Sequence, residues 1–109
     1  MRPIVVVEIE PRQLAEKLAA GEALYLVDVR QPWEHETAAL PGSLLIPLGE
    51  LRTRADEIQP PSGALVVVYC HHGVRSLSGA WLLERHGAVS LAGGIDRWSL
   101  EIDGRVPRY

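Results

Sequence analysis

The sequence lacks phenylalanine and asparagine, and it contains only one cysteine, Cys70, among 109 residues. A single cysteine cannot form a disulfide within the chain, so Cys70 is either a buried, inert thiol or a free thiol in a reducing compartment. No apolar run approaches the roughly 18 to 20 residues that a membrane span needs. The apolar stretch before Glu8 is also too short for a secretory signal. We therefore expect a cytoplasmic protein with no membrane partner.

A large excess of charge is also missing. Eleven basic and fourteen acidic residues give a formal net charge of -3, which argues against nucleic-acid binding. Hydrophobic residues make up 47% and charged residues 23% of the chain, an ordinary globular composition. The length suits one core. We predict a single domain over residues 1–109, and the sequence leaves the oligomeric state open.

Strand and helix patterns alternate through the whole chain. Nearly continuous apolar runs at 23–29 and 64–69 are typical of strands covered on both faces of a parallel sheet. Parallel neighbours need crossover connections, so the pattern predicts an α/β fold with a five-stranded parallel sheet flanked by helices on both faces. The predicted strands are 4–9, 23–29, 44–46, 64–69 and 88–91, and the predicted helices are 12–20, 48–58, 76–86 and a final turn at 95–98, with 31–37 as a connection or one helical turn.

The stretch VVVYCHHGVRS, residues 66–76, combines a strand, a short polar loop and the start of a helix. In an open parallel sheet the ligand site lies beyond the carboxyl ends of the strands, where Cys70 falls. Loop amides and the positive end of a helix stabilise negative charge on sulfur at such a place. A small polar loop packs poorly around an inert thiol, so we predict that Cys70 is a nucleophile.

Other residues of this loop have predicted roles around a sulfur anion. If the thiolate holds sulfur as a persulfide, a loop curled at Gly73 would stabilise negative charge in both states. Arg75 is expected to bind an anionic donor or balance the charge of the loop, with a structural ion pair as the alternative. Adjacent histidines do not converge on one metal ion, so His71 and His72 are interpreted as exposed residues that tune the local charge, with acid–base catalysis as the alternative.

Asp28 interrupts the apolar run 23–29 near its carboxyl end. A buried carboxylate is costly unless it is hydrogen-bonded, so we expect Asp28 to accept from backbone amides or to pair with an arginine. The same sheet edge would then carry Asp28 and Cys70. Glu34 and Glu36 are interpreted as solvated loop charges, with Glu34 as a possible partner for a loop arginine, and His35 is expected at the surface.

Four ordered motifs between residues 26 and 98 resemble those of single-domain rhodaneses, a sulfurtransferase family. LVDVRQPWEHE is similar to the family's D-V-R-x-x-x-E-[FY], and LPGSLLIPLGEL is similar to I-P-G-A-x-x-I-P-x-x-E-L. VVYCHHGVRS resembles the active loop, and LAGGIDRW resembles L-x-G-G-x-x-x-W. Two positions depart from the family pattern: Ala38-Ala39 replace a Gly-His pair that often precedes I-P-G, and His35 stands where an aromatic residue is usual.

The resemblance implies the rhodanese fold and a sulfurtransferase that needs no metal or organic cofactor. It implies a donor such as thiosulfate, another small anionic sulfur compound or a protein persulfide, and an acceptor such as cyanide or a thiol. Cys70 would carry the sulfur as a persulfide. The other implied site residues form the active loop (His71, His72, Gly73, Val74 and Arg75) or support it (Asp28, Arg30 and Ser76).

Two alternatives remain open at this point. Cysteine phosphatases and arsenate reductases need a C-x5-R loop that encloses a tetrahedral oxyanion, whereas Cys70 and Arg75 form a C-x4-R loop, one residue shorter. The shorter loop suits a single sulfur atom. A non-catalytic regulatory module or sulfur carrier of the same fold is the second alternative, although the usual sign of a non-catalytic module is loss of the cysteine.

Overall fold

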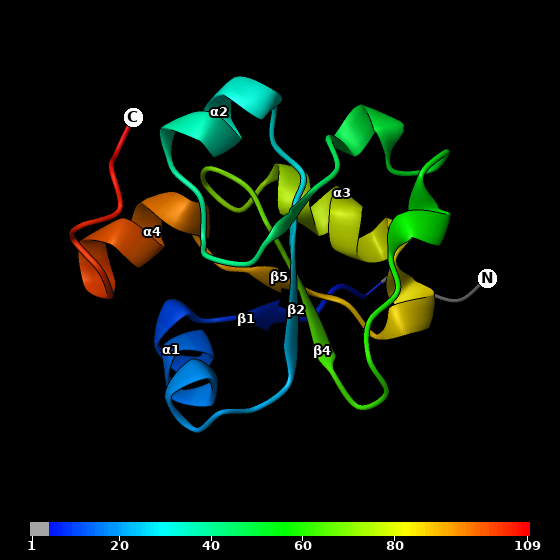
Figure 1. The fold of residues 1–109 in the computed structure, drawn as a ribbon, viewed down its shortest axis with the longest axis horizontal. Coiled ribbons are helices and arrows are strands. Elements are labelled where there is room, and N and C mark those ends of the chain that lie inside the picture. Colours follow the sequence, from blue (N-terminus) through cyan, green and yellow to red (C-terminus); the bar gives the residue numbers. More distant parts are fainter. Residues whose placement is uncertain (1–4) are drawn as a thin grey trace.

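The computed structural model describes residues 5–109 and contains a five-stranded sheet in which all paired strands are parallel. The strand order is β1-β5-β4-β2-β3, with helices on both faces (Figure 1). The strands are β1 (Glu8–Ile9), β2 (Leu24–Asp28), β3 (Leu44–Leu45), β4 (Leu65–Tyr69) and β5 (Val89–Leu91). The helices are α1 (Pro11–Ala19), α2 (Pro32–Thr37), α3 (Arg75–Leu82) and α4 (Gly94–Glu101).

The predicted α/β fold is confirmed, although the first strand covers only Glu8–Ile9. Residue 4 of its predicted range lies outside the described residues. Within residues 5–109, no helix has the length and apolar character that crossing a membrane requires.

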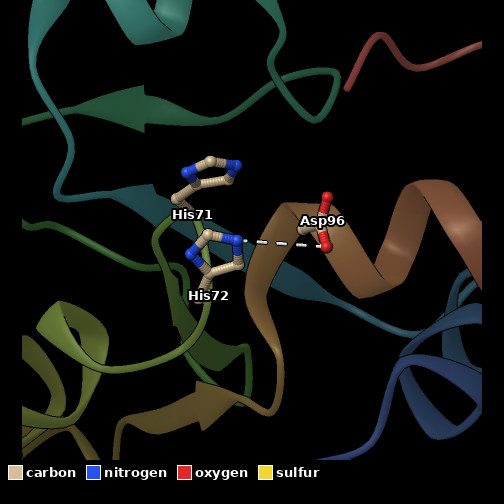
Figure 2. A group of neighbouring side chains, drawn as sticks. All are labelled: His71, His72 and Asp96. Carbon is tan, nitrogen blue, oxygen red and sulfur yellow. Dashed lines mark ion pairs between the residues drawn. The ribbon is translucent and has the colours of Figure 1, made fainter. Parts of the chain in front are cut away.

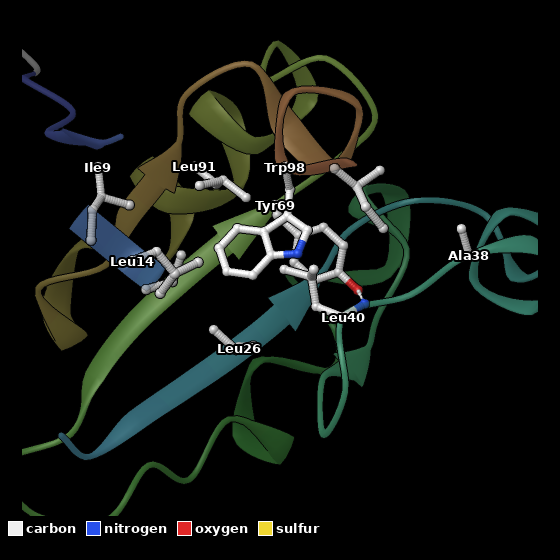
Figure 3. Close-up of a cluster of buried hydrophobic side chains, with 10 residues drawn as sticks. Ile9, Leu14, Leu26, Ala38, Leu40, Tyr69, Leu91 and Trp98 are labelled. Carbon is white, nitrogen blue, oxygen red and sulfur yellow. Dashed lines mark hydrogen bonds between the residues drawn. The ribbon is translucent and has the colours of Figure 1, made fainter. Parts of the chain in front are cut away.

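The central strand β4 carries side chains for two hydrophobic clusters, because successive residues of a strand point to opposite faces. Val66, Val68 and Cys70 pack with residues of α3 and of the segment that follows β3. Val67 and Tyr69 pack on the other face with residues of α1 and α4 (Figure 3). The sheet is therefore buried on both faces, as the continuous apolar runs predicted.

The predicted helix at 48–58 is wrong in type. The segment forms two short 3₁₀ turns, Leu48–Glu50 and Ala55–Glu57, although Leu51 and Ile58 are both buried as the helical spacing suggested. The Leu48 amide donates to the Val29 carbonyl at 3.0 Å, so tertiary hydrogen bonding fixes the start of the segment. Leu51 and Ile58 follow these two turns and pack in the same hydrophobic cluster, on the face of the sheet that α3 covers.

The helix predicted at 76–86 is shorter than expected. The α-helix α3 ends at Leu82, and a separate 3₁₀ turn follows at Glu84–His86. Gly87 then adopts a φ of 66°, which ends the turn and leads into β5.

The ends of three neighbouring strands assemble the site. β2 and β4 end in register, with Asp28 opposite Tyr69, so Asp28 and Cys70 lie at the same edge of the sheet, as predicted. β5 lies on the other side of β4 and leads through Gly93 into α4. The connections β2–α2, β4–α3 and β5–α4 therefore leave the same carboxyl edge of the sheet.

Candidate active site

Residues 70–76, the cysteine loop, wrap around the sulfur atom of Cys70. Cys70 is only 1% exposed. Its Sγ accepts hydrogen bonds from the amides of Gly73 at 3.1 Å and Ser76 at 3.3 Å. Gly73 has a φ of 91°, a conformation that glycine adopts without strain, and this allows the chain to turn back over the sulfur. Two amide donors directed at Sγ stabilise a negative charge there.

Helix α4 holds the other side of the loop. The carbonyls of Cys70 and His71 accept hydrogen bonds from the amides of Ile95 at 2.9 Å and Asp96 at 3.1 Å. In a trans peptide the N–H points in the direction opposite to the C=O. The amides of His71 and His72, which share peptide units with these two carbonyls, therefore face away from α4. The approach requires glycine at position 94, where a Cβ would lie 2.5 Å from the Cys70 carbonyl oxygen and closer still to that of His71.

Two buried serine hydroxyls lie behind the sulfur. Ser76 Oγ is 3.4 Å from Cys70 Sγ and 2.7 Å from Ser90 Oγ. A Cys70 thiol can donate a hydrogen bond to Ser76 Oγ. A Cys70 thiolate can instead accept one from the Ser76 hydroxyl, which then accepts a hydrogen bond from the Ser90 hydroxyl. The Ser76 hydroxyl can therefore form a hydrogen bond with either form of the sulfur. The sequence analysis missed Ser90. Its signal was a single polar residue within the apolar strand Val89–Leu91.

Asp28 and Arg30 form a fully buried ion pair at the edge of the sheet. Arg30 donates to Asp28 through Nε and Nη2, both at 2.8 Å, and through its backbone amide at 3.0 Å. Burial works to lower the pKa of Arg30, but hydrogen bonds with Asp28 and Tyr109 outweigh it and raise that pKa above its usual value. The expected partners of Asp28 are thus confirmed. The prediction for His35 needs correction, because the side chain is partly buried and its Nδ1 lies 2.8 Å from Asp28 Oδ2.

Glu34 and Arg75 form a second ion pair, between α2 and the cysteine loop. Glu34 is only 3% exposed, so the interpretation of this residue as a solvated loop charge is wrong. Arg75 Nη1 and Nη2 donate to its two carboxylate oxygens at 2.7 and 2.9 Å, which confirms the possible pairing with a loop arginine. These bonds lower the pKa of Glu34 to about 2 against the opposing effect of burial, with further help from the Gln31 amide and the Tyr109 hydroxyl. The expected role of Arg75 in donor binding stays a prediction.

We expect Glu34→Gln to lower the free energy of unfolding at neutral pH by roughly 1 to 2 kcal/mol, less than for a fully buried pair because the Arg75 side chain is 37% exposed. The folded-state pKa of Glu34, about 2, lies below the ordinary value of 4.5. The contribution of the pair is therefore complete above about pH 4.5 and is lost as the pH falls toward 2. Urea unfolding measured across this range tests the expectation.

The exposed carboxylate Glu36, on the same helix, provides the control variant Glu36→Gln. The stability difference between the native protein and Glu34→Gln should shrink as the pH falls, while Glu36→Gln should stay close to the native protein throughout. A difference for Glu34→Gln that is just as large at pH 2 would contradict the assignment of this stability to the ion pair.

His71 and His72 lie close to Asp96, where the cysteine loop meets α4 (Figure 2). The two imidazole rings are stacked with centroids 3.8 Å apart, and His72 Nε2 is 4.0 Å from Asp96 Oδ2. His71 is partly buried rather than exposed as predicted, and burial lowers its pKa. Val74, at the outside of the loop, is 72% exposed.

The same three side chains bring ligand-type atoms within 4.8 Å of one another. Asp96 is already bound by Arg108 Nε at 2.9 Å, so a metal ion at this place would compete with that ion pair. The expected lack of a metal stays a prediction.

Tyr109 is a further residue of the site that the sequence analysis missed. Its hydroxyl bridges Arg30 and Glu34, and its ring stacks on His71 with centroids 4.0 Å apart and an interplanar angle of 10°. Tyr109 lies beyond the last recognisable motif and in no periodic pattern. Because the partners of its hydroxyl are far away in the sequence, no pattern around Tyr109 indicates this role.

Comparisons with known proteins agree with this geometry. A model of the rhodanese-like domain matches residues 10–101. A protein of Allochromatium vinosum named "Sulfurtransferase" is 35% identical over 98 residues, which cover 87% of this chain and 90% of that protein. "Probable adenylyltransferase/sulfurtransferase MoeZ" of Mycobacterium tuberculosis is 33% identical over 104 residues, which cover 93% of this chain but only 26% of that protein.

Among solved structures, a rhodanese-related protein from Thermoplasma volcanium superimposes with a TM-score of 0.77 at 30% identity. The match covers 88% of this chain and 93% of that one.

Proposed function

Because the chain belongs to the rhodanese-like domain family, we propose that it is a sulfurtransferase that carries sulfane sulfur as a persulfide on Cys70. The observation that carries this proposal is the environment of Cys70 Sγ, which accepts hydrogen bonds from two backbone amides inside a tight loop. Those donors favour the negative charge that both a thiolate and a persulfide bear. The relative named as a sulfurtransferase supports the same reaction class.

The reaction proceeds by two displacements. The Cys70 thiolate attacks the outer sulfur of thiosulfate or of a persulfide donor, the S–S bond of the donor breaks, and sulfite or a thiolate leaves with the bonding electron pair. Cyanide or an acceptor thiolate then attacks the terminal sulfur of the Cys70 persulfide. The S–S bond of the Cys70 persulfide breaks, and Cys70 returns as a thiolate. No external oxidant or reductant is needed.

The size and charge of the loop disfavour phosphate chemistry. The C-x4-R spacing is one residue shorter than the phosphatase loop. Both terminal nitrogens of Arg75 bind Glu34, so the guanidinium is not free to clamp a tetrahedral oxyanion. A sulfur carrier would share the loading step and differ only in the acceptor.

Incubation with thiosulfate and cyanide tests the proposal, with thiocyanate as the measured product and release of phosphate from an aryl phosphate as the competing assay. We expect thiocyanate and no phosphate. Sulfur loading without thiocyanate would favour a sulfur carrier, and phosphate release without loading would overturn the sulfurtransferase.

We expect Arg75→Ala to raise the KM for thiosulfate by about tenfold and to affect an uncharged alkyl persulfide less, because loss of the guanidinium leaves the negative charge of Glu34 unbalanced near the anionic donor. Steady-state kinetics with the two donors measures the change in KM for each of them. Arg105→Ala is the control, since that side chain is almost fully exposed and pairs with nearby Asp103. Equal losses for both donors would show that Arg75 anchors the loop instead.

A further inference from the structure

The chain that follows α4 returns to the active site. In Figure 1 it leaves the end of α4 and runs toward the level of α2. Ser99 Oγ donates to the Val106 carbonyl at 2.6 Å, and Arg108 Nε binds Asp96 at 2.9 Å. Val106 and Tyr109 pack against the hydrophobic cluster under α1 and α4. This segment lies outside residues 10–101, which match the family model.

The Tyr109 hydroxyl connects the two ion pairs of the site. It accepts a hydrogen bond from Arg30 Nη1 at 2.6 Å and donates one to Glu34 Oε2 at 2.7 Å. Burial raises the pKa of Tyr109 to about 12, so the hydroxyl keeps the proton that it donates. Arg30 is fully buried, and its Nε and Nη2 bind Asp28. Loss of the hydroxyl would leave Nη1 without this partner, which is costly for a buried charge.

The Tyr109 ring reaches the cysteine loop directly. It lies parallel to the His71 ring, with centroids 4.0 Å apart, and meets Trp33 of α2 edge-on at 5.6 Å. His71 directly follows the nucleophile, while Arg75, held through Glu34, lies at the other end of the loop. Tyr109 therefore touches one end of the loop with its ring and reaches the opposite end through its hydroxyl.

We propose that Tyr109 is a positioning residue that holds both ends of the cysteine loop in the curved form seen around Cys70. The amides of Gly73 and Ser76 reach Sγ only when the loop keeps this curvature. Loosening the loop lowers the fraction of molecules in which both amides face the sulfur, and so lowers kcat more than it raises KM. This catalytic consequence rests on the proposed function, whereas the effect on the loop itself does not.

Two substitutions separate the contributions of the ring and the hydroxyl. Tyr109→Phe keeps the ring and removes the hydroxyl, and Tyr109→Ala removes both. We expect Tyr109→Ala to lower kcat for sulfur loading, measured by intact mass, by about tenfold with little change in KM, and Tyr109→Phe to restore part of the loss. Hydrogen exchange of the peptide that contains residues 70–76 should be faster than in the native protein in both variants, and fastest in Tyr109→Ala.

Tyr25→Phe is the matched control, because the Tyr25 hydroxyl accepts from the Gln59 amide at 3.2 Å and lies toward the opposite end of β2. If Tyr109→Ala keeps the native kcat and the native rate of hydrogen exchange at residues 70–76, the proposal is overturned. If Tyr109→Ala does not fold, native behaviour of Tyr109→Phe would overturn the role of the hydroxyl. Accelerated loop exchange in a protein that never loads sulfur would uphold the positioning role and reject the proposed function.

Discussion

Cys70→Ser should abolish sulfur loading and reduce turnover by at least about a thousandfold. A serine hydroxyl fits the space of the thiol and keeps the amides of Gly73 and Ser76 in place, but it stays protonated near neutral pH and forms no persulfide. Thiocyanate formation from thiosulfate and cyanide measures turnover, and intact mass measures loading. Near-native stability in urea would show that the loss is chemical.

Ser78→Ala is a suitable control, since Ser78 lies on α3 with an exposed side chain. It should retain native turnover. Thiosulfate-dependent thiocyanate formation retained by Cys70→Ser would rule out Cys70 as the nucleophile.

Gly94→Ala should have the next largest effect. Gly94 has a φ of 63°, and a Cβ there would lie 2.5 Å from the Cys70 carbonyl oxygen, which is backbone and cannot move aside as a flexible side chain would. We expect a loss of roughly 2 to 4 kcal/mol in the free energy of unfolding. Sulfur loading should fall more than tenfold even in the folded fraction, because the shift displaces the loop that surrounds Sγ. Urea unfolding and loading kinetics measure the two effects.

Gly63→Ala separates the steric clash from the strain of a positive φ, because Gly63 has a φ of 82° and a Cβ there meets nothing within 4 Å. This control should cost only about 1 kcal/mol and should retain native sulfur loading. Native stability and loading in Gly94→Ala would show that α4 does not constrain the cysteine loop.

The sheet was predictable because burial on both faces leaves a direct signal. The apolar runs that became β2 and β4 identified parallel strands, and the position of Asp28 near the end of one run correctly required a hydrogen-bonded partner. The turn chemistry of Gly73 also indicated a tight loop after Cys70. These features depend on neighbours in sequence, so local reasoning reached them.

Features that depend on distant contacts were less predictable. The apolar spacing between Leu51 and Ile58 fits an α-helix and also two 3₁₀ turns. The bond from the Leu48 amide to the Val29 carbonyl, which fixes the start of the segment, leaves no signal in the local sequence. Gly93 and Gly94 were visible only as part of the L-x-G-G-x-x-x-W motif, which does not reveal that Gly94 allows backbone contact between α4 and the cysteine loop.

Tyr109 illustrates the same limit at the site itself. Its role follows from hydrogen bonds to Arg30 and Glu34, which are 79 and 75 residues away in the sequence. A single tyrosine outside every motif and periodic pattern gives no sign of these partners. Such a residue becomes visible only when the fold brings the chain after α4 back to the edge of the sheet.

Intact mass of the purified protein, recorded after thiosulfate or persulfide treatment and again after cyanide, tests the central claim most directly. The account predicts a gain of one sulfur atom, located on the peptide that contains Cys70, and complete loss of that sulfur when cyanide is added, with thiocyanate as the product. An unchanged mass with every donor, or sulfur that cyanide does not remove, would contradict sulfur transfer through a Cys70 persulfide.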